Sequence, residues 1–159
     1  MKEIKLSRGL VAIVDDEDYD YLNQWKWNAH RSNSRTFIAR RTIWNGKKSR
    51  EISMHRVIMK TPEGLQVDHI NHNGLDNRKC NLRNCAQSEN AKNRLAYGEV
   101  KYLGVTYKRT RQYKYISARI YSKGKYIALG SYKTLEDAAR AYDEAAKKYH
   151  GEFANLNFK

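Results

Sequence analysis

Three stretches rich in β-branched and aromatic residues stand close together in the C-terminal part of the 159-residue chain, and an alanine-rich stretch follows them. The first three, residues 103–107, 113–121 and 125–130, are separated by turn-prone residues and therefore predict three antiparallel strands. The alanine-rich stretch begins at Thr134, an N-cap residue with an acid three positions later, and stops at Gly151. It predicts one helix that packs on the sheet.

Alternation along residues 113–121 separates two faces of the predicted sheet. Ile116, Ala118 and Ile120 fall on one face, which the small alanines of the helix can approach closely. Arg119 and Tyr121 fall on the other face, together with further polar and aromatic residues. The second face is therefore expected to be exposed.

The charge of the chain is strongly positive, with 31 Lys and Arg against 17 Asp and Glu and a formal net charge of +14. Residues 101–133 contain nine Lys and Arg and no acidic residue. This imbalance indicates a polyanionic partner. The mean hydropathy of -0.90 and the lack of any long apolar run exclude a membrane-spanning helix, so no membrane partner is expected.

The N-terminal part predicts further small β elements and a short helix. Residues 4–14 suggest a hairpin that turns at Arg8 and Gly9, and residues 15–27 begin with an acid-rich turn suited to a helix start. Residues 36–44 and 50–59 suggest a second strand pair around an Asn-Gly turn. With the C-terminal sheet and helix, this organisation predicts the α+β class.

A dense group of polar residues follows Pro62, the only proline. Asp68 and His69 stand side by side at the end of a short apolar strand, before a loop rich in Asn and Gly. Residues 81–83 form a second strand-like run, and residues 88–93 look like a capped helix start. A strand, a loop, a strand and a helix are thus expected within residues 67–93.

This segment resembles the HNH nucleases of the ββα-metal class, especially the phage and intron-encoded homing endonuclease branch. The resemblance covers residues 54–94, and several matching groups occur in order with the right gaps. These groups are His55-Arg56, Pro62-Glu63-Gly64, Asp68-His69, Asn81-Leu82-Arg83 and Ser88-Glu89-Asn90. The resemblance implies metal-dependent hydrolysis of a phosphodiester bond in DNA.

The resemblance also implies a role for each residue of the site. His69 would be the general base, Asp68 and Asn90 would hold a divalent ion, and Asn81 would brace the loop and orient His69. Oxygen ligands favour a hard ion, so Mg²⁺ is expected and Mn²⁺ would also serve. Since neighbouring residues on a regular strand face opposite ways, Asp68 and His69 can share a site only where the strand bends or ends.

Each of these residues also has an ordinary structural alternative. Asp68 could cap the strand end, His69 could be a satisfied polar side chain, and Asn90 could be a helix-start cap. His55 could contact phosphate or belong to the hairpin core, and His72 is expected to be a solvated loop residue. The combination of these residues in one register favours the nuclease interpretation over each alternative.

The two cysteines, Cys80 and Cys85, raise the alternative of a structural zinc site. Zinc-binding relatives usually present paired Cys-x-x-Cys knuckles, whereas this chain has a single Cys-x4-Cys spacing. Structural zinc is therefore not expected. Two cysteines are also too few for a disulfide scaffold, so we expect buried free thiols.

Residues 102–105, 118–120, 128–132, 134–143 and 151–158 resemble the APETALA2 and ethylene-response-factor DNA-binding domain. The resemblance implies a three-stranded sheet in the major groove, which is about 12 Å wide, with a helix packed behind the sheet. Most contacts would hold phosphates, and Arg119 would read a base edge. The expected contact residues are Lys108, Arg109, Arg111, Arg119, Tyr121, Lys125 and Tyr126.

The sequence departs from the plant pattern of this domain at informative positions. Leu103 and Thr106 stand where plant members usually have arginine, and Arg119 stands where they have glutamate. Tyr121 replaces an arginine, and Ala128 replaces a tryptophan. We therefore expect the scaffold to transfer but the plant sequence preference to be lost. A basic face that serves solubility alone is the alternative, although nine basic residues exceed what solubility requires.

The predicted organisation is a β-rich lead-in and nuclease domain over residues 1–97, with its core at 54–94, and an APETALA2-like domain over 98–159. The predicted function is a site-selective, homing-type endonuclease that cuts double-stranded DNA as a monomer or weak dimer. The N-terminus lacks the apolar core of a secretory signal, so a cytoplasmic location is expected. Additional backbone contacts could come from Arg40, Arg41, Lys47, Lys48 and Arg50.

Two other functions stay open. One is a non-catalytic DNA-binding or regulatory protein on a decayed nuclease scaffold. The other is an RNA-binding protein, although the sequence lacks the aromatic signature of common RNA modules.

Overall fold

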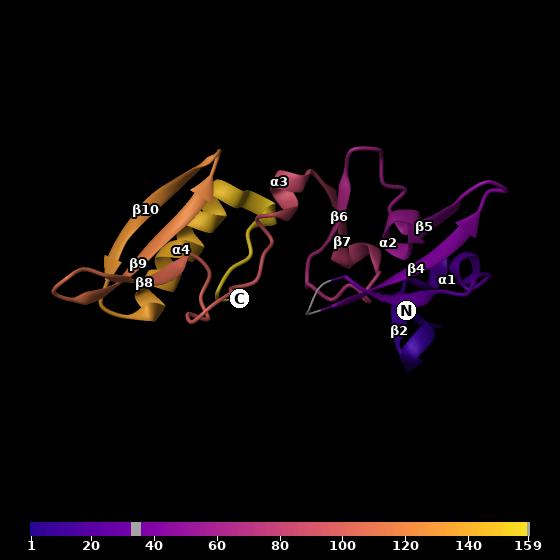
Figure 1. The fold of residues 1–159 in the computed structure, drawn as a ribbon, viewed down its shortest axis with the longest axis horizontal. Coiled ribbons are helices and arrows are strands. Elements are labelled where there is room, and N and C mark those ends of the chain that lie inside the picture. The colour runs from indigo at the N-terminus through magenta and orange to yellow at the C-terminus, as the bar shows by residue number, and fades with distance from the viewer. Residues whose placement is uncertain (33–35, 159) are drawn as a thin grey trace. The chain divides into compact units, whose positions relative to one another are not determined.

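The computed structural model describes residues 1–32 and 36–158, and the chain divides into two compact units, Met1–Gln87 and Ser88–Lys159 (Figure 1). Small antiparallel sheets and a few helices make up both units, which confirms the α+β class. This division falls ten residues before the domain boundary that the sequence predicts at 97. The two units are described separately below.

The first unit begins with a two-stranded antiparallel sheet formed by β1 (Lys2–Lys5) and β2 (Val11–Val14). The turn between them contains a short 3-10 helix (Ser7–Gly9), in which Arg8 and Gly9 have positive φ angles of 64° and 68°. This hairpin was predicted. Helix α1 (Asp16–Leu22) follows with three acidic residues in its first turn, where they complement the helix dipole.

A three-stranded antiparallel sheet follows, in the order β3 (Asn28–Arg31), β4 (Phe37–Trp44) and β5 (Ser49–Ser53). The side chain of Asn45 accepts the backbone N–H groups of Lys47 and Lys48 at 3.1 and 2.8 Å, which fixes the β4–β5 turn. The strand predicted over 50–59 is wrong in its second half. Met54–Ile58 forms helix α2, whose first and last residues are buried one helical turn apart.

The segment with the expected chemistry contains β6 (Gln66–His69) and β7 (Leu82–Cys85), which pair antiparallel. A 3-10 turn (Lys79–Asn81) leads into β7, and α3 (Gln87–Asn90) follows it. The predicted strand, loop, strand and helix are therefore present in order. The ββα-metal arrangement of these elements stays a prediction, because α3 crosses the boundary between the two units.

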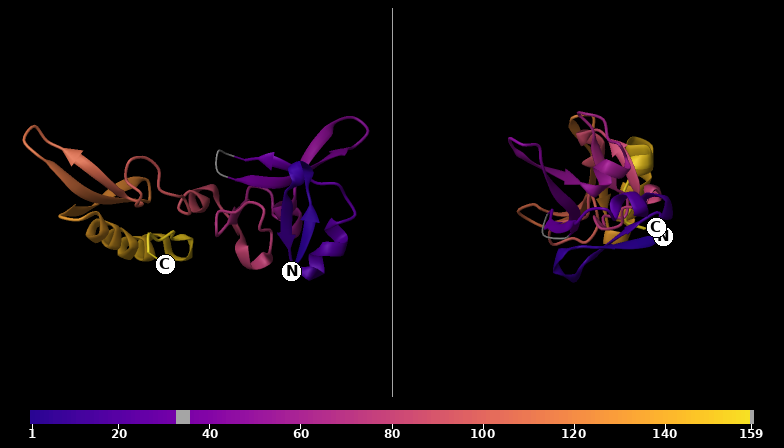
Figure 2. Two further views of the ribbon diagram at one scale, coloured as in Figure 1. Left: turned by 90° about the horizontal axis from the view of Figure 1, so that it is seen from below. Right: turned by 90° about the vertical axis from the view of Figure 1, so that its right-hand side faces the viewer.

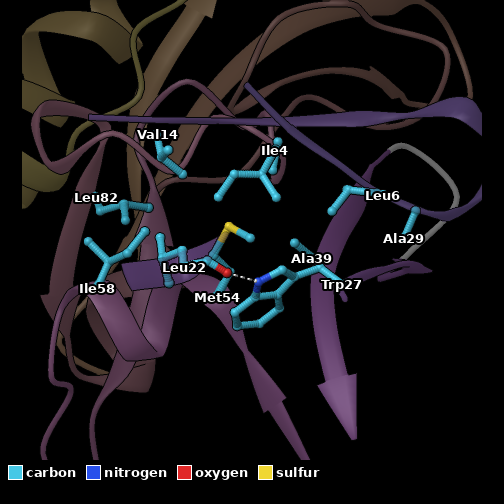
Figure 3. Close-up of a cluster of buried hydrophobic side chains, with 11 residues drawn as sticks. Ile4, Leu6, Val14, Leu22, Trp27, Ala29, Ala39, Met54, Ile58 and Leu82 are labelled. Carbon is cyan, nitrogen blue, oxygen red and sulfur yellow. Dashed lines mark hydrogen bonds between the residues drawn. The ribbon is translucent and has the colours of Figure 1, made fainter. Parts of the chain in front are cut away.

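One hydrophobic core holds the first unit together (Figure 3). Its buried side chains come from the β1–β2 sheet, the β3–β4–β5 sheet, α1, α2 and β7. The Trp27 indole N–H donates to the Leu22 carbonyl at 2.9 Å. The residues in this core are Ile4, Leu6, Ala12, Val14, Leu22, Trp27, Ala29, Ala39, Met54, Ile58 and Leu82. Because α2 and β7 both contribute, the core fixes the helix and the β-ribbon that carry the candidate site.

In the second unit, β8 (Val105–Arg109), β9 (Lys114–Ser122) and β10 (Lys125–Tyr132) form an antiparallel sheet with β9 in the centre. Helix α4 (Leu135–His150) lies along one face of this sheet (Figure 2). A 3-10 turn (Gly151–Phe153) follows it. The Thr134 side chain accepts the Asp137 backbone N–H at 3.1 Å, as expected of an N-cap.

Burial in the second unit follows the predicted alternation. Ala118 and Ile120 are buried against alanines of α4, whereas Arg119 and Tyr121 are exposed on the face that α4 does not cover. This second face is called the outer face below. None of the helices in the described part of the chain is long and apolar enough to cross a lipid bilayer.

Candidate functional site

The candidate site of the first unit lies at the end of β6, where Asp68 and His69 are adjacent. Asp68 pairs with Arg83 across the β-ribbon and His69 pairs with Leu82, so the two side chains start from opposite faces of a regular ladder. The strand ends at His69. The two side chains could share a site only where the strand bends or ends, so this condition is met. The His69 ring packs edge-on against His55 of α2, with ring centroids 5.1 Å apart and planes at 86°.

Asp68 is buried, with 5% of its surface exposed, and forms an ion pair with Arg83. The Nε and Nη2 atoms of Arg83 both donate to Oδ2 of Asp68, at 2.9 and 2.7 Å. A buried carboxylate requires such compensation, because desolvation of an unpaired charge costs several kcal/mol, on the order of 3 to 5. The sequence signal for this role of Arg83 is its position opposite Asp68 in the β6–β7 hairpin.

The imidazole of His69 is held in its neutral form. Burial lowers its pKa, while the polar side chain of the neighbouring Asn77 and the charges of Asp68 and Asp76 act in the opposite direction. Burial also lowers the pKa of His55 to about 3, with further contributions from His69 and nearby arginines. A neutral imidazole is the form that can accept a proton.

Asn81 braces the loop between β6 and β7. Its side-chain oxygen accepts the Asn71 backbone N–H at 2.9 Å, and its side-chain nitrogen donates to the Asp76 carbonyl at 2.8 Å. Its own carbonyl accepts the Ile70 N–H at 2.9 Å. These contacts hold the loop that returns Asn77 toward His69.

The same loop contains a second buried carboxylate, Asp76. Arg78 donates to its two oxygens at 2.7 Å each, and this contact lowers the pKa of Asp76. The Asn71 side chain also donates to Asp76 at 2.8 Å. The loop is therefore fixed by charged and neutral hydrogen bonds together.

Asn77 is a residue that the sequence analysis did not assign. It is fully buried, and its backbone N–H donates to the Ile13 carbonyl of β2 at 2.8 Å. The Ile13 N–H donates to Leu75 at the same distance. Gly74 approaches the Phe37 carbonyl so closely that a Cβ atom would overlap it. Docking of the loop on two strands thus positions Asn77 beside His69.

Asn90, the other predicted metal ligand, is the last residue of α3 and belongs to the second unit. Its pairing with Asp68 in one metal site therefore stays a prediction. Within residues 1–32 and 36–158, no three His, Cys, Asp or Glu side chains gather as a metal-binding cluster. The predicted donor set of one carboxylate and one amide suits a hard ion that keeps water and phosphate ligands. Of the cysteines, Cys85 is buried and Cys80 is exposed.

The predicted DNA contacts all lie in the second unit, and all are exposed. The strand register places four of them on the outer face, namely Lys108, Arg119, Tyr121 and Tyr126. Arg109 and Lys125 have the opposite parity at strand ends, and Arg111 lies in the β8–β9 turn. The structure therefore separates the seven residues into a group on the sheet face and a group at its rim.

Comparison with known proteins supports a nuclease. Residues 54–92 match the family model described as HNH endonuclease, a range that includes α2, β6, β7 and α3. An uncharacterized HNH endonuclease, L560, of Acanthamoeba polyphaga mimivirus is 28% identical over 152 residues. That alignment covers 94% of this chain and 76% of the viral protein. The similarity thus extends through both units.

The C-terminal part has separate relatives among plant transcription factors. The AP2-like ethylene-responsive transcription factor TOE2 of Arabidopsis thaliana is 45% identical over 58 residues. APETALA2-like protein 2 of Oryza sativa matches equally well over the same length. These alignments cover 36% of this chain but only 11% and 13% of the plant proteins. The shared part is therefore one small module.

Proposed function

We propose that this chain is a metal-dependent, homing-type DNA endonuclease with His69 as its general base. The observation that carries the proposal is a buried imidazole with a lowered pKa, packed against His55, next to a buried carboxylate inside the range that matches HNH endonucleases. DNA as the substrate is supported by the nuclease match and by the AP2-like module.

In the proposed reaction, the His69 imidazole takes a proton from a water molecule as that water attacks the phosphorus atom. The bond from phosphorus to the 3′ oxygen then breaks. Asn81 acts as a positioning residue, because its contacts fix the loop rather than the substrate, and that loop brings Asn77 close to His69. Asp68 and Asn90 would hold the divalent ion, most simply Mg²⁺. When bound, that ion would offset negative charge on the phosphate and the leaving oxygen.

The second unit would hold the DNA. The outer face presents arginine, lysine and tyrosine, and the sheet has the width of one layer of backbone and side chains that a major groove admits. We propose that Arg119 reads a base edge while Lys108 and the rim residues hold phosphates. With a single His69 site, one molecule would nick one strand, and cleavage of both strands would need a second molecule or a second event.

A plasmid-nicking assay tests this function. Purified protein should convert supercoiled plasmid to the nicked form in Mg²⁺, and His69→Ala should lower the rate by about 100-fold or more. His30→Ala removes an exposed histidine of the same unit and is the matched control. Equal, negligible nicking by the unmodified protein and His69→Ala would rule out the endonuclease.

A non-catalytic DNA-binding protein is the second candidate, and the Asp68–Arg83 ion pair favours it. Arg83 already compensates the carboxylate that the nuclease would use for an ion. A scaffold that had lost catalysis would keep such a pair for stability. Duplex binding without nicking in either Mg²⁺ or Mn²⁺ would support this candidate over the first.

A further inference from the structure

A pocket of about 300 Å³ lies beside the outer face in the second unit. Thr106 of β8, Arg119 of β9 and Tyr126 of β10 line it from the sheet. Residues 94–97, which precede the sheet in the chain, line it from another direction. Because α4 covers the opposite face, the pocket is open to a ligand that approaches the sheet.

The 94–97 segment is a fixed part of the second unit. The Asn155 side chain donates to the Arg94 carbonyl at 2.8 Å. Ala96 packs against the buried cluster around Tyr142, on the side of the sheet that carries α4. These two contacts anchor Arg94 and Ala96 to the second unit, so this wall of the pocket is held at two positions.

The sheet side of the pocket carries a stacked pair of planar groups. The Arg119 guanidinium carbon lies 4.3 Å from the centroid of the Tyr126 ring. Tyr121 packs edge-on against the same ring at 5.0 Å and 63°. Tyr126 is nevertheless 57% exposed. An ordered but accessible pair of tyrosine and arginine is the kind of platform on which an unstacked nucleobase lies.

The other residues that line the pocket suit the phosphate and sugar of a nucleotide. Arg94 and Arg119 bring two positive charges, and none of the described lining residues is acidic. Leu95 and Leu103 add apolar surface. The volume lies at the lower end of the range for ligand pockets. A bare phosphate would leave the aromatic and apolar surface unused, and a peptide segment without acidic side chains would lack a partner for the arginines.

We propose that this pocket receives one unstacked nucleotide of the bound DNA, with the base against the Arg119–Tyr126 pair and the phosphate facing Arg94. The proposal rests on DNA as the substrate in the proposed function. It gives the second unit a preference for DNA in which one base has left the stack. This preference is additional to the contacts with phosphates and groove edges.

Binding of a bulged duplex tests the pocket. The full chain, without divalent metal, is titrated with two duplexes of one sequence, one fully paired and one with a single unpaired 2-aminopurine. We expect about 10-fold tighter binding of the bulged duplex, with a change in 2-aminopurine fluorescence. Tyr126→Ala and Arg119→Ala should lose the preference, and Tyr126→Phe should keep it. Tyr113→Ala removes a tyrosine that is 61% exposed outside the pocket and is the matched control.

Equal affinity for the two duplexes, without a fluorescence change, would overturn the proposal. A preference that survives in Tyr126→Ala and Arg119→Ala would overturn it as well, because the base would then lie elsewhere. Plasmid nicking after addition of Mg²⁺ is measured on the same preparation. Nicking without a preference for the bulged duplex would contradict only the proposed nucleotide pocket. A preference for the bulged duplex without nicking would support the pocket and contradict the proposed endonuclease activity.

Discussion

The candidate sites of the two units place their charged groups in opposite ways. In Met1–Gln87, the carboxylates Asp68 and Asp76 are buried and each is paired with an arginine two or fifteen residues away. In Ser88–Lys159, arginine and tyrosine lie exposed on the outer face of a sheet whose other face packs on alanines. Burial together with an arginine partner fixes the position of a carboxylate, whereas a polyanion can only meet charge that stays accessible.

The largest expected effect is the loss of DNA cleavage by a substitution in the first unit that leaves the second unit unchanged. Asp68→Asn keeps the shape of the side chain and an oxygen for Arg83 but removes the negative charge. We expect nicking to fall by about 100-fold or more, since the proposed ion site would lose its one negatively charged ligand. Duplex affinity, measured without metal, should stay within about two-fold because the outer face is unchanged.

The control for this substitution is Asp20→Asn, which neutralises an exposed carboxylate on α1. It should leave nicking unchanged. A loss of duplex binding in Asp68→Asn, with a folded protein, would show that the two units do not divide cleavage and binding.

The next effect breaks the fold of the second unit. Gly104 has a φ angle of +71°, and a Cβ atom there would overlap the Tyr142 ring and approach the Arg119 carbonyl. Gly104→Ala should lower the free energy of unfolding of this unit by about 3 kcal/mol or more, from backbone strain and overpacking together. Gly124→Ala is the matched control, because Gly124 has a φ angle of +81° with open space around it.

Gly124→Ala should cost only the strain, about 1 kcal/mol. Thermal unfolding monitored by amide exchange would locate each loss. Equal destabilisation by both substitutions would mean that the Tyr142 contact contributes nothing.

A smaller effect concerns the buried histidine of the first unit. The folded-state pKa of His55 is about 3, below the ordinary value of 6.5, so the unfolded chain binds a proton at this site that the folded chain does not. Stability is therefore complete above pH 6.5 and falls as the pH drops toward 3. His55→Phe keeps a flat ring beside His69 and removes this titration. Between pH 7 and pH 5, the unmodified protein should lose on the order of 2 kcal/mol more than the variant.

Urea unfolding at several pH values measures this difference, with His30→Phe as the control for an exposed imidazole. Parallel pH dependence of the unmodified protein and His55→Phe would mean that His55 is hydrated in the folded state. His55 would then not count among the buried polar groups that distinguish the first unit from the second.

The sequence predicted the second unit better than the first, for a physical reason. Alternation along β9 and the cap at Thr134 are local signals, and they determine which face of the sheet meets α4. In the first unit, strand 50–59 was predicted where α2 begins at Met54. The Asn-Gly turn predicts the hairpin correctly. The strand ends at Ser53 because Met54 and Ile58 are buried in a core formed by residues distant in sequence.

The candidate site shows the same limit. Asp68, His69 and Asn81 stand in a recognisable order along the chain, so they could be named from the sequence. Asn77 could not, because it reaches His69 only after the loop docks on Ile13 of β2, far away in sequence. Such long-range hydrogen bonds leave no periodic signal.

The smallest predicted effect sharpens the comparison by destabilising the second unit without touching its outer face. The Thr134 hydroxyl accepts the Asp137 backbone N–H at 3.1 Å and donates to its carboxylate at 2.8 Å. Thr134→Ala removes both contacts at the start of α4 and should cost about 1 kcal/mol, whereas Thr134→Ser should keep most of it. Because the second unit stays folded under assay conditions, nicking and duplex affinity should match those of the unmodified protein, and only the unfolding midpoint of the second unit should shift. A parallel loss of nicking would mean that cleavage in the first unit depends on the stability of α4, and the two units could not be treated as independent.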